Sequence, residues 1–179
     1  ADTSGLALDL DGTGDSAVIT EYKGPIGKVG HTVSLWLKGL PQFADDGVTR
    51  KSTELIHWGD GRTATNRYTL RVNNAANFNE FRVDVNGAYI YGSTNIVDDQ
   101  WHHLAVVHAA NSPLAAVTLY VDGKAETATT PGGNGINTIL DTLSRDDFRI
   151  GNTFKGQIDD VLLFHRALTA EQVAALHSA

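Results

Sequence analysis

The residues best suited to ligand chemistry lie in a hairpin predicted over residues 80–92. Asn86-Gly87 at its centre favours a two-residue type I′ turn, because both central residues of that turn have positive φ. Alternation along the two strands leaves two tyrosines, an arginine and an aspartate on the face away from the core: Tyr89, Tyr91, Arg82 and Asp84. Aromatic rings stack on the C–H faces of sugars, and charged side chains hydrogen-bond sugar hydroxyls. This face therefore predicts a glycan site.

Two further residues extend the candidate site. Arg71 lies in the segment Arg67–Asn73, where alternation turns it away from the core. Trp58 stands beside the Gly59-Asp60-Gly61 turn, where it would form a platform at the rim; the ambiguous parity of its strand also allows a place in the core. The alternative for the whole face is a solvated surface, on which Tyr–Arg and Arg–Asp pairs contribute only about 0.2–1 kcal/mol each.

The carboxylates do not form a hydrolase pattern. Retaining glycosidases use two carboxyl groups about 5–5.5 Å apart. Glu80 and Asp84 share a face, but Arg82 lies between them and would hold both as carboxylates, whereas a general acid must carry a proton. The sequence also lacks the His-Glu-x-x-His, Walker and Gly-x-Ser-x-Gly motifs. We therefore expect no catalytic activity.

Composition excludes several classes of protein. With 14 basic and 21 acidic residues the net charge is −7, which disfavours nucleic acid and anionic membrane surfaces as partners. No apolar run approaches the roughly 20 residues of a membrane-spanning helix, so we expect no membrane insertion. The absence of cysteine excludes a disulfide scaffold, and a chain beginning with Ala1 is typical of a processed product. We expect a secreted or cell-surface, extracellular location.

Short period-two runs between Gly, Asn and Asp turns predict an all-β fold. We expect strands at Leu6–Leu10, Ser16–Ile19, Thr32–Lys38, Glu54–Trp58, Arg67–Asn73, Glu80–Asn86, Ala88–Gly92, Trp101–His108, Val117–Val121, Lys124–Ala128, Asp147–Ile150 and Gly156–His165. One helix follows, because Thr169-Ala170-Glu171-Gln172 fits a capping box. No repeat or boundary interrupts the chain, which predicts a single domain over residues 1–179.

A series of phrases then resembles a known family. In order they are Leu10–Asp15, Thr32–Lys38, Trp101–Val107, Leu119–Gly123, Ile150-Gly151, Gly156–Val161 and His165–Gln172. Together they resemble the laminin-G-like domains of the concanavalin A-like lectin/glucanase superfamily, especially the bacterial LamG-like jelly rolls. The resemblance implies a two-sheet antiparallel jelly-roll β-sandwich with a short C-terminal helix. We expect its core to contain Trp36, Trp101, Leu104, Val106, Leu119 and Val161. The alternating acids of related laminarinase-type hydrolases are absent.

The resemblance also implies a structural calcium ion near the chain termini. Ca²⁺ takes about six to eight oxygen ligands. The turn from Asp11 to Asp15 is rich in oxygens, and the late strand with Asp159 and Asp160 pairs near the N-terminus in this family. Neighbouring strand residues face opposite ways, so only one of Asp159 and Asp160 can reach a given point. The alternative is that these aspartates cap turns.

The sequence thus predicts a non-catalytic carbohydrate-binding module within a larger secreted polysaccharide-degrading or surface protein. Its expected partner is a polysaccharide or glycan. The alternative is a LamG-like adhesion domain that binds a protein partner and no glycan.

Overall fold

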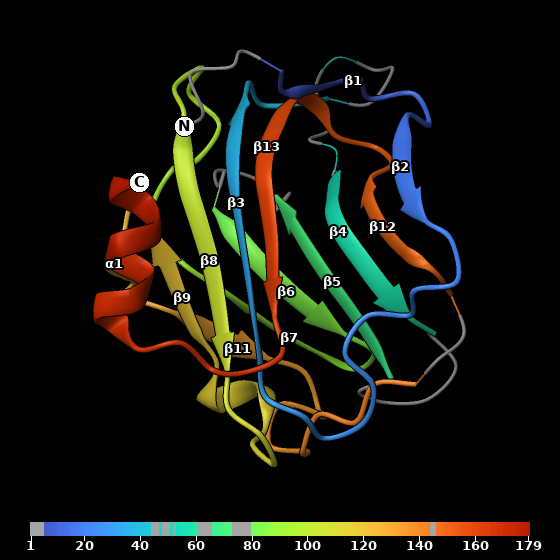
Figure 1. The fold of residues 1–179 in the computed structure, drawn as a ribbon, viewed down its shortest axis with the longest axis vertical. Coiled ribbons are helices and arrows are strands. Elements are labelled where there is room, and N and C mark those ends of the chain that lie inside the picture. The colour runs from blue at the N-terminus through green and yellow to red at the C-terminus, as the bar shows by residue number, and fades with distance from the viewer. Residues whose placement is uncertain are drawn as a thin grey trace.

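The computed structural model describes residues 6–43, 47, 51, 53–60, 66–72, 80–143 and 146–179. Its strands form two sheets stacked face to face (Figure 1), and every strand pairing is antiparallel. The six-stranded sheet has the order β1 (Leu8–Asp11), β13 (Lys155–Phe164), β3 (His31–Gly39), β8 (His102–His108), β9 (Thr118–Val121) and β10 (Lys124–Ala125).

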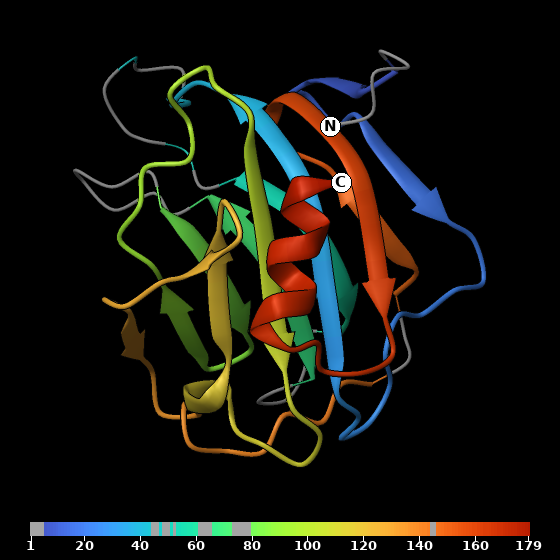
Figure 2. The ribbon, with the colours of Figure 1, turned by 60° about the vertical axis from the view of Figure 1, so that its left-hand side comes forward.

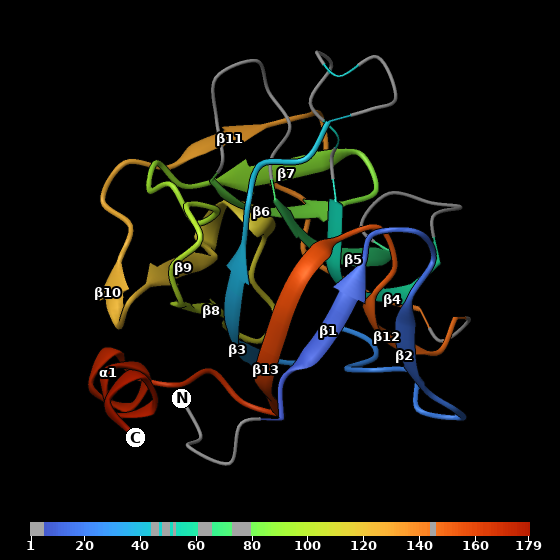
Figure 3. The ribbon, with the colours of Figure 1, turned by 90° about the horizontal axis from the view of Figure 1, so that it is seen from above.

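The seven-stranded sheet has the order β11 (Thr130–Gly132), β7 (Ala88–Tyr91), β6 (Phe81–Val85), β5 (Arg67–Val72), β4 (Thr53–Gly59), β12 (Phe148–Gly151) and β2 (Ser16–Ile19). A 3₁₀ turn, η1 (Leu114–Ala116), and one helix, α1 (Ala170–Ser178), complete the described elements. Seen from above, β1 and β2 lie at the same side of the sandwich, because one turn carries the chain from the first sheet to the second (Figure 3). The predicted all-β sandwich with a C-terminal helix is confirmed.

The core lies between the two sheets. Leu104, Val106 and Leu119 are fully buried there, as predicted. Trp58 lies at its centre with its indole stacked on Tyr68 at a centroid distance of 4.3 Å. Such an aromatic cluster buries a large apolar area, which is the main favourable contribution to folding.

Trp36 and Trp101 are not core residues, and this part of the prediction is wrong. On β3 the side chains of Leu35 and Leu37 enter the core, so Trp36 between them points to the opposite face. It packs there against His177 of α1, with ring centroids 5.6 Å apart. Trp101 precedes β8 and is half-buried. Val161 is partly buried and packs against the margin of the core.

Helix α1 covers the outer surface of the six-stranded sheet, over β3 and β8 (Figure 2). It begins with the predicted capping box: Thr169 Oγ1 accepts a hydrogen bond from the Gln172 N–H, and Gln172 Oε1 accepts one from the Thr169 N–H. Val173 then packs with Ala105 in a small second apolar cluster. The helix therefore covers part of this sheet surface, whereas Leu162 of β13 remains 41% exposed.

Buried histidines make the fold sensitive to acid. Burial and, to a lesser extent, the neighbouring His108 lower the pKa of His31 to about 3. Burial lowers the pKa of His103 to about 4. An imidazole in the unfolded chain titrates near about pH 6.5. Below that pH the unfolded state binds protons that the folded state does not, so the free energy of unfolding falls as the pH falls from about 6.5 toward 4.

We expect the stability of the chain, measured by chemical denaturation, to decrease between about pH 7 and pH 5. His31→Phe keeps the ring contacts with Trp58 and Tyr68 and should flatten this dependence by up to about 1.4 kcal/mol per pH unit. Arg166→Gln, at an exposed position and without a change in any histidine, is the control and should leave the slope unchanged. Equal slopes for wild type and His31→Phe would contradict this assignment.

Candidate functional site

The outer face of the seven-stranded sheet, which points away from the core, carries two aligned rows of side chains. In each row, residues directly opposite one another on neighbouring strands form a line across the sheet. The first row runs through Arg149, His57, Thr69, Asp84 and Tyr89. The second runs through Glu54, Arg71, Arg82, Tyr91 and Thr130. Five of the six predicted ligand-binding residues lie in these rows.

The two tyrosines lie on the outer face, as the pairing across the predicted hairpin required. The rings of Tyr89 and Tyr91 stack at a centroid distance of 6.0 Å and an interplanar angle of 18°. The Arg82 guanidinium lies 4.2 Å from the centroid of Tyr89, in cation–π geometry. Gly132 on β11 gives the Tyr89 ring room, because a Cβ at that position would collide with it. Both rings remain partly exposed.

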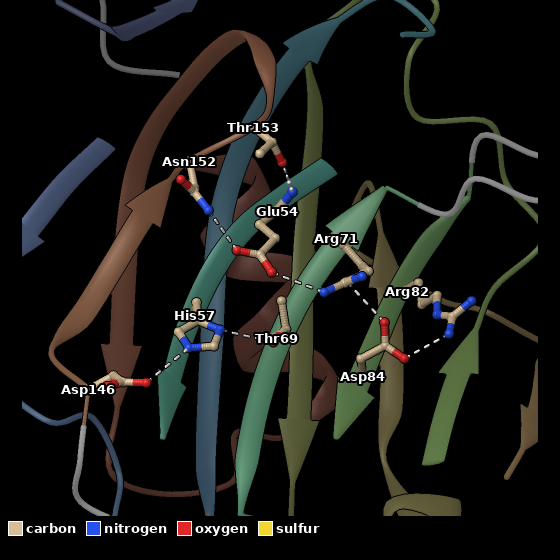
Figure 4. A network of polar contacts seen from close by, with 9 residues as sticks. All are labelled: Glu54, His57, Thr69, Arg71, Arg82, Asp84, Asp146, Asn152 and Thr153. Atoms are coloured by element: carbon tan, nitrogen blue, oxygen red, sulfur yellow. Dashed lines mark hydrogen bonds and ion pairs between the residues drawn. The ribbon is translucent and has the colours of Figure 1, made fainter. Parts of the chain in front are cut away.

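A network of ion pairs holds the polar side chains beside the tyrosines (Figure 4). One oxygen of Asp84 accepts a hydrogen bond from Arg82 Nη2 at 2.7 Å, and the other forms an ion pair with Arg71 Nε at 3.0 Å. Arg71 Nη2 also contacts Glu54 Oε1 at 3.1 Å, so one guanidinium joins two carboxylates. Glu54 is further fixed by Asn152 Nδ2 at 3.1 Å. Charge-assisted bonds of this kind restrict the rotamers of every side chain involved.

Burial of this network is unusual for charged groups on a sheet face. Asp84 is only 6% exposed. Burial lowers the pKa of Arg71, and the neighbouring carboxylates of Asp84 and Glu54 oppose that effect. A buried charge is tolerated only when it is paired and hydrogen-bonded. The network therefore holds its polar groups in fixed orientations.

His57 adds a neutral imidazole next to this network. Its Nδ1 lies 3.1 Å from Thr69 Oγ1, and its Nε2 lies 4.0 Å from Asp146 Oδ2. Burial lowers the pKa of His57; Arg67 and Arg149 lower it further, and Glu54 and Asp146 oppose them. Hydroxyl, imidazole and carboxylate thus lie in line, but Thr69 is fully buried and cannot reach a bound molecule. The arrangement orients His57 and does not form a nucleophile.

Glu54, His57 and Thr69 were not among the predicted site residues. The reason lies in β4, whose register shifts between Glu54 and Ile56. This β-bulge buries both Leu55 and Ile56 and brings Glu54 and His57 to the same face. In the sequence, two adjacent apolar residues between polar ones, Leu55 and Ile56, would have indicated this bulge.

Trp58 is not part of the site, which corrects its assignment as a rim platform. Its side chain is 0% exposed. The indole N–H donates to the Pro25 carbonyl at 3.1 Å, and Gly24 leaves room for the ring on one side. Since the rings of His31, Tyr68 and Phe148 also pack on the indole, no ligand can stack on Trp58.

The four aspartates predicted to bind calcium do not meet. Asp11 is paired with Lys155 across β1 and β13, and Asp159 lies four residues further along β13, which separates them by about 13 Å. Asp11 Oδ1 accepts from the Thr13 N–H and Asp15 Oδ2 from the Asp11 N–H, while Asp159 Oδ1 accepts from the Asp160 N–H.

The aspartates therefore fit the alternative, in which they cap turns. Within the described ranges no group of three or more His, Asp or Glu side chains could hold a metal ion. The four predicted aspartates therefore do not form one calcium site with one another.

We therefore expect the melting temperature to be the same in excess Ca²⁺ and in excess chelator, measured by differential scanning calorimetry. A native-state ion at about 100 times its Kd would add roughly 2.7 kcal/mol, which is several degrees for a domain of this size. Asp11→Asn is the control. A calcium-dependent rise that this variant abolishes would restore the metal site.

Comparison with known proteins places this geometry in a family. Residues 11–174 match the concanavalin A-like lectin/glucanases superfamily, in its laminin G subgroup. The chain belongs to this family. A comparison with curated protein sequences found no match. No helix among the described residues has the length and apolar character needed to cross a membrane.

Solved structures share the fold of this family member. Domain 4 of the extracellular arabinanase AbnA from Geobacillus stearothermophilus, in complex with arabinotriose, aligns over 98% of this chain and 78% of its own, with 23% identity and a TM-score of 0.66. The leech intramolecular trans-sialidase aligns over 94% of this chain and 26% of its own, with 15% identity and a TM-score of 0.63.

A third similar structure is a toxin domain. The binding domain of botulinum neurotoxin DC, in complex with rat synaptotagmin II, aligns over 84% of this chain and 36% of its own, with 11% identity and a TM-score of 0.57. The chain thus spans less than half of the sialidase and neurotoxin chains. At these identities the likeness concerns the fold.

Proposed function

We propose that this chain is a non-catalytic carbohydrate-binding module of a larger secreted or cell-surface protein. The observation that carries the proposal is the pair of stacked, partly exposed tyrosines beside a pre-oriented Arg–carboxylate network on the outer face. Tyr89 and Tyr91 supply flat apolar surfaces for sugar rings. Arg82, Asp84 and Arg71 supply charged hydrogen-bonding groups at fixed positions.

The described groups of the face support binding in preference to catalysis. Glu54 and Asp84 are both bonded to Arg71, so neither is suited to carry the proton of a general acid. Thr69 beside His57 has no access to a ligand. The fold likeness to the arabinanase domain that was solved with arabinotriose supports arabino-oligosaccharides as the first ligands to test.

A protein partner is the second candidate. The edge strand β2 exposes Val18 and Ile19 by 45% and 46%, and its outer edge is unpaired within the described part of the sheet. Apolar side chains on an open strand edge are typical of protein-docking surfaces. A neurotoxin binding domain, of which 36% aligns with this chain, was solved in complex with synaptotagmin II.

Titration calorimetry with arabino-oligosaccharides, after an array of plant and algal polysaccharides has identified further ligands, tests the proposal. Tyr89→Ala and Tyr91→Ala should each reduce affinity by about tenfold or more, because each removes a stacking surface. Circular dichroism should be unchanged, since neither side chain enters the core. Phe43→Ala removes an exposed aromatic residue of the described chain outside the two rows and is the matched control. Unchanged affinity in both tyrosine variants for a confirmed glycan ligand would refute this site.

Incubation with the same polysaccharides should release neither reducing ends nor unsaturated products. The expected result follows from the pairing of both carboxylates with Arg71. Asp84→Asn distinguishes a genuine activity from a contaminating enzyme. Product release by the wild type that this substitution abolishes would show that the domain is a hydrolase or lyase.

A further inference from the structure

Two guanidiniums on the outer face have no ion-pair partner among the described residues. Arg149 on β12 lies directly opposite His57, and Arg67 lies on β5, two residues before Thr69 on the same face. Both side chains are half-buried. In each, Nε is buried and makes no hydrogen bond within the described part of the chain. Arginines held in this way differ from solvated surface arginines, because they have lost water without gaining an anion.

The other charges of the face are balanced within it. Arg71 and Arg82 are paired with Glu54 and Asp84, two cations with two anions. Burial and the flanking arginines lower the pKa of His57, so its imidazole is neutral near pH 7.

Among the described residues near His57, Asp146 is the carboxylate without a cationic partner, since Asp147 is paired with Lys23. The Asp146 side chain is 59% exposed and lies 4.0 Å from His57 Nε2. With Arg67 and Arg149 the excess of charge is positive, in a protein whose net charge is −7.

We propose that Arg67 and Arg149 form an anion subsite that takes the carboxylate of a uronic acid unit in a bound oligosaccharide. The inference rests on the proposed glycan-binding function and specifies its ligand class. A guanidinium presents a planar fork of donors that matches a carboxylate, and the bonds it forms are charge-assisted. Because the protein as a whole repels anions, this attraction is local and selects a ligand that also fits the rest of the face.

Arg149 and Tyr89 lie at opposite ends of the first row, and Arg67 lies beside this row on β5, opposite Gly59. From Arg149 to Tyr89 the first row crosses four strand spacings, which at about 4.8 Å each is about 19 Å. A monosaccharide cannot span this distance. The ligand is therefore an extended, partly acidic oligosaccharide that crosses the strands, with sugar rings on Tyr89 and Tyr91 and a carboxylate at Arg67 and Arg149.

Galacturonic acid oligosaccharides and their methyl esters are the matched probes, since esterification removes the charge and keeps the sugar chain. By titration calorimetry the acid form should bind at least about tenfold more tightly than the ester at low ionic strength. This advantage should shrink in about 1 M salt, where screening acts over about 3 Å. Arg67→Gln and Arg149→Gln should each reduce the advantage and leave the affinity for the ester unchanged.

Two further variants control for charge and for folding. Arg149→Lys keeps the positive charge but loses the planar fork of donors, so it should retain only part of the preference for the acid form over the ester. Arg166→Gln removes an exposed arginine near α1 and should bind like the wild type. Circular dichroism and the melting temperature of each variant establish that it is folded.

The outcomes separate the subsite from the proposed function. Equal affinity for acid and ester, together with a loss of binding in Tyr89→Ala, would overturn the subsite and keep the glycan-binding function. Absence of binding to any glycan would overturn both. Tighter binding of a sulfated oligosaccharide through the same arginines would overturn the assignment of a carboxylate.

Discussion

The sandwich depends on the burial of one face of each sheet against the other. Side chains alternate along a strand, so burial of Leu70 and Val83 forces Arg71 and Arg82 to the opposite face. A shift of register by one residue would place guanidiniums in the core, at a cost of many kcal/mol. The same burial that stabilises the fold therefore aligns the polar rows on the outer face, and no separate interaction is needed to bring them together.

The outer surfaces of the two sheets differ because of the C-terminal helix. On the six-stranded sheet α1 packs over Trp36 and His103, and their rings contact His177. On the seven-stranded sheet no described helix covers the outer face; its described residues are mostly polar or aromatic, apart from Val18 opposite Arg149, and part of their surface is accessible. A ligand can reach the second surface, whereas the first is occupied by the protein itself.

The Arg71 guanidinium shows how a charged face can be both stable and ready for a ligand. It bonds to Glu54 and Asp84 together, so the loss of hydration by these three groups is offset by contacts at 3.0–3.1 Å. Side chains held in this way lose little further conformational entropy on binding. Arg67 and Arg149 have no ion-pair partner among the described residues, so their loss of hydration is not offset in this way. This difference separates their end of the face from its middle.

Local signals in the sequence determined much of this arrangement. Asn86-Gly87 fixed the phase of the hairpin, and with it the faces of Tyr89, Tyr91, Arg82 and Asp84, because a two-residue turn admits one pairing. Thr169 and Gln172 likewise fixed the start of α1, since a capping box depends only on residues three apart.

Only the tertiary structure decided the remaining features, because each depends on contacts between distant segments. The bulge in β4 brings Glu54 and His57 to the face and places Trp58 in the core, and it arises from pairing with β5. Trp36 lies on the outer face of β3, where α1 covers it. In the sequence, an apolar residue that enters the core looks the same as one that a helix covers. The register of β1 on β13 separates Asp11 from Asp159, which no local pattern could have shown.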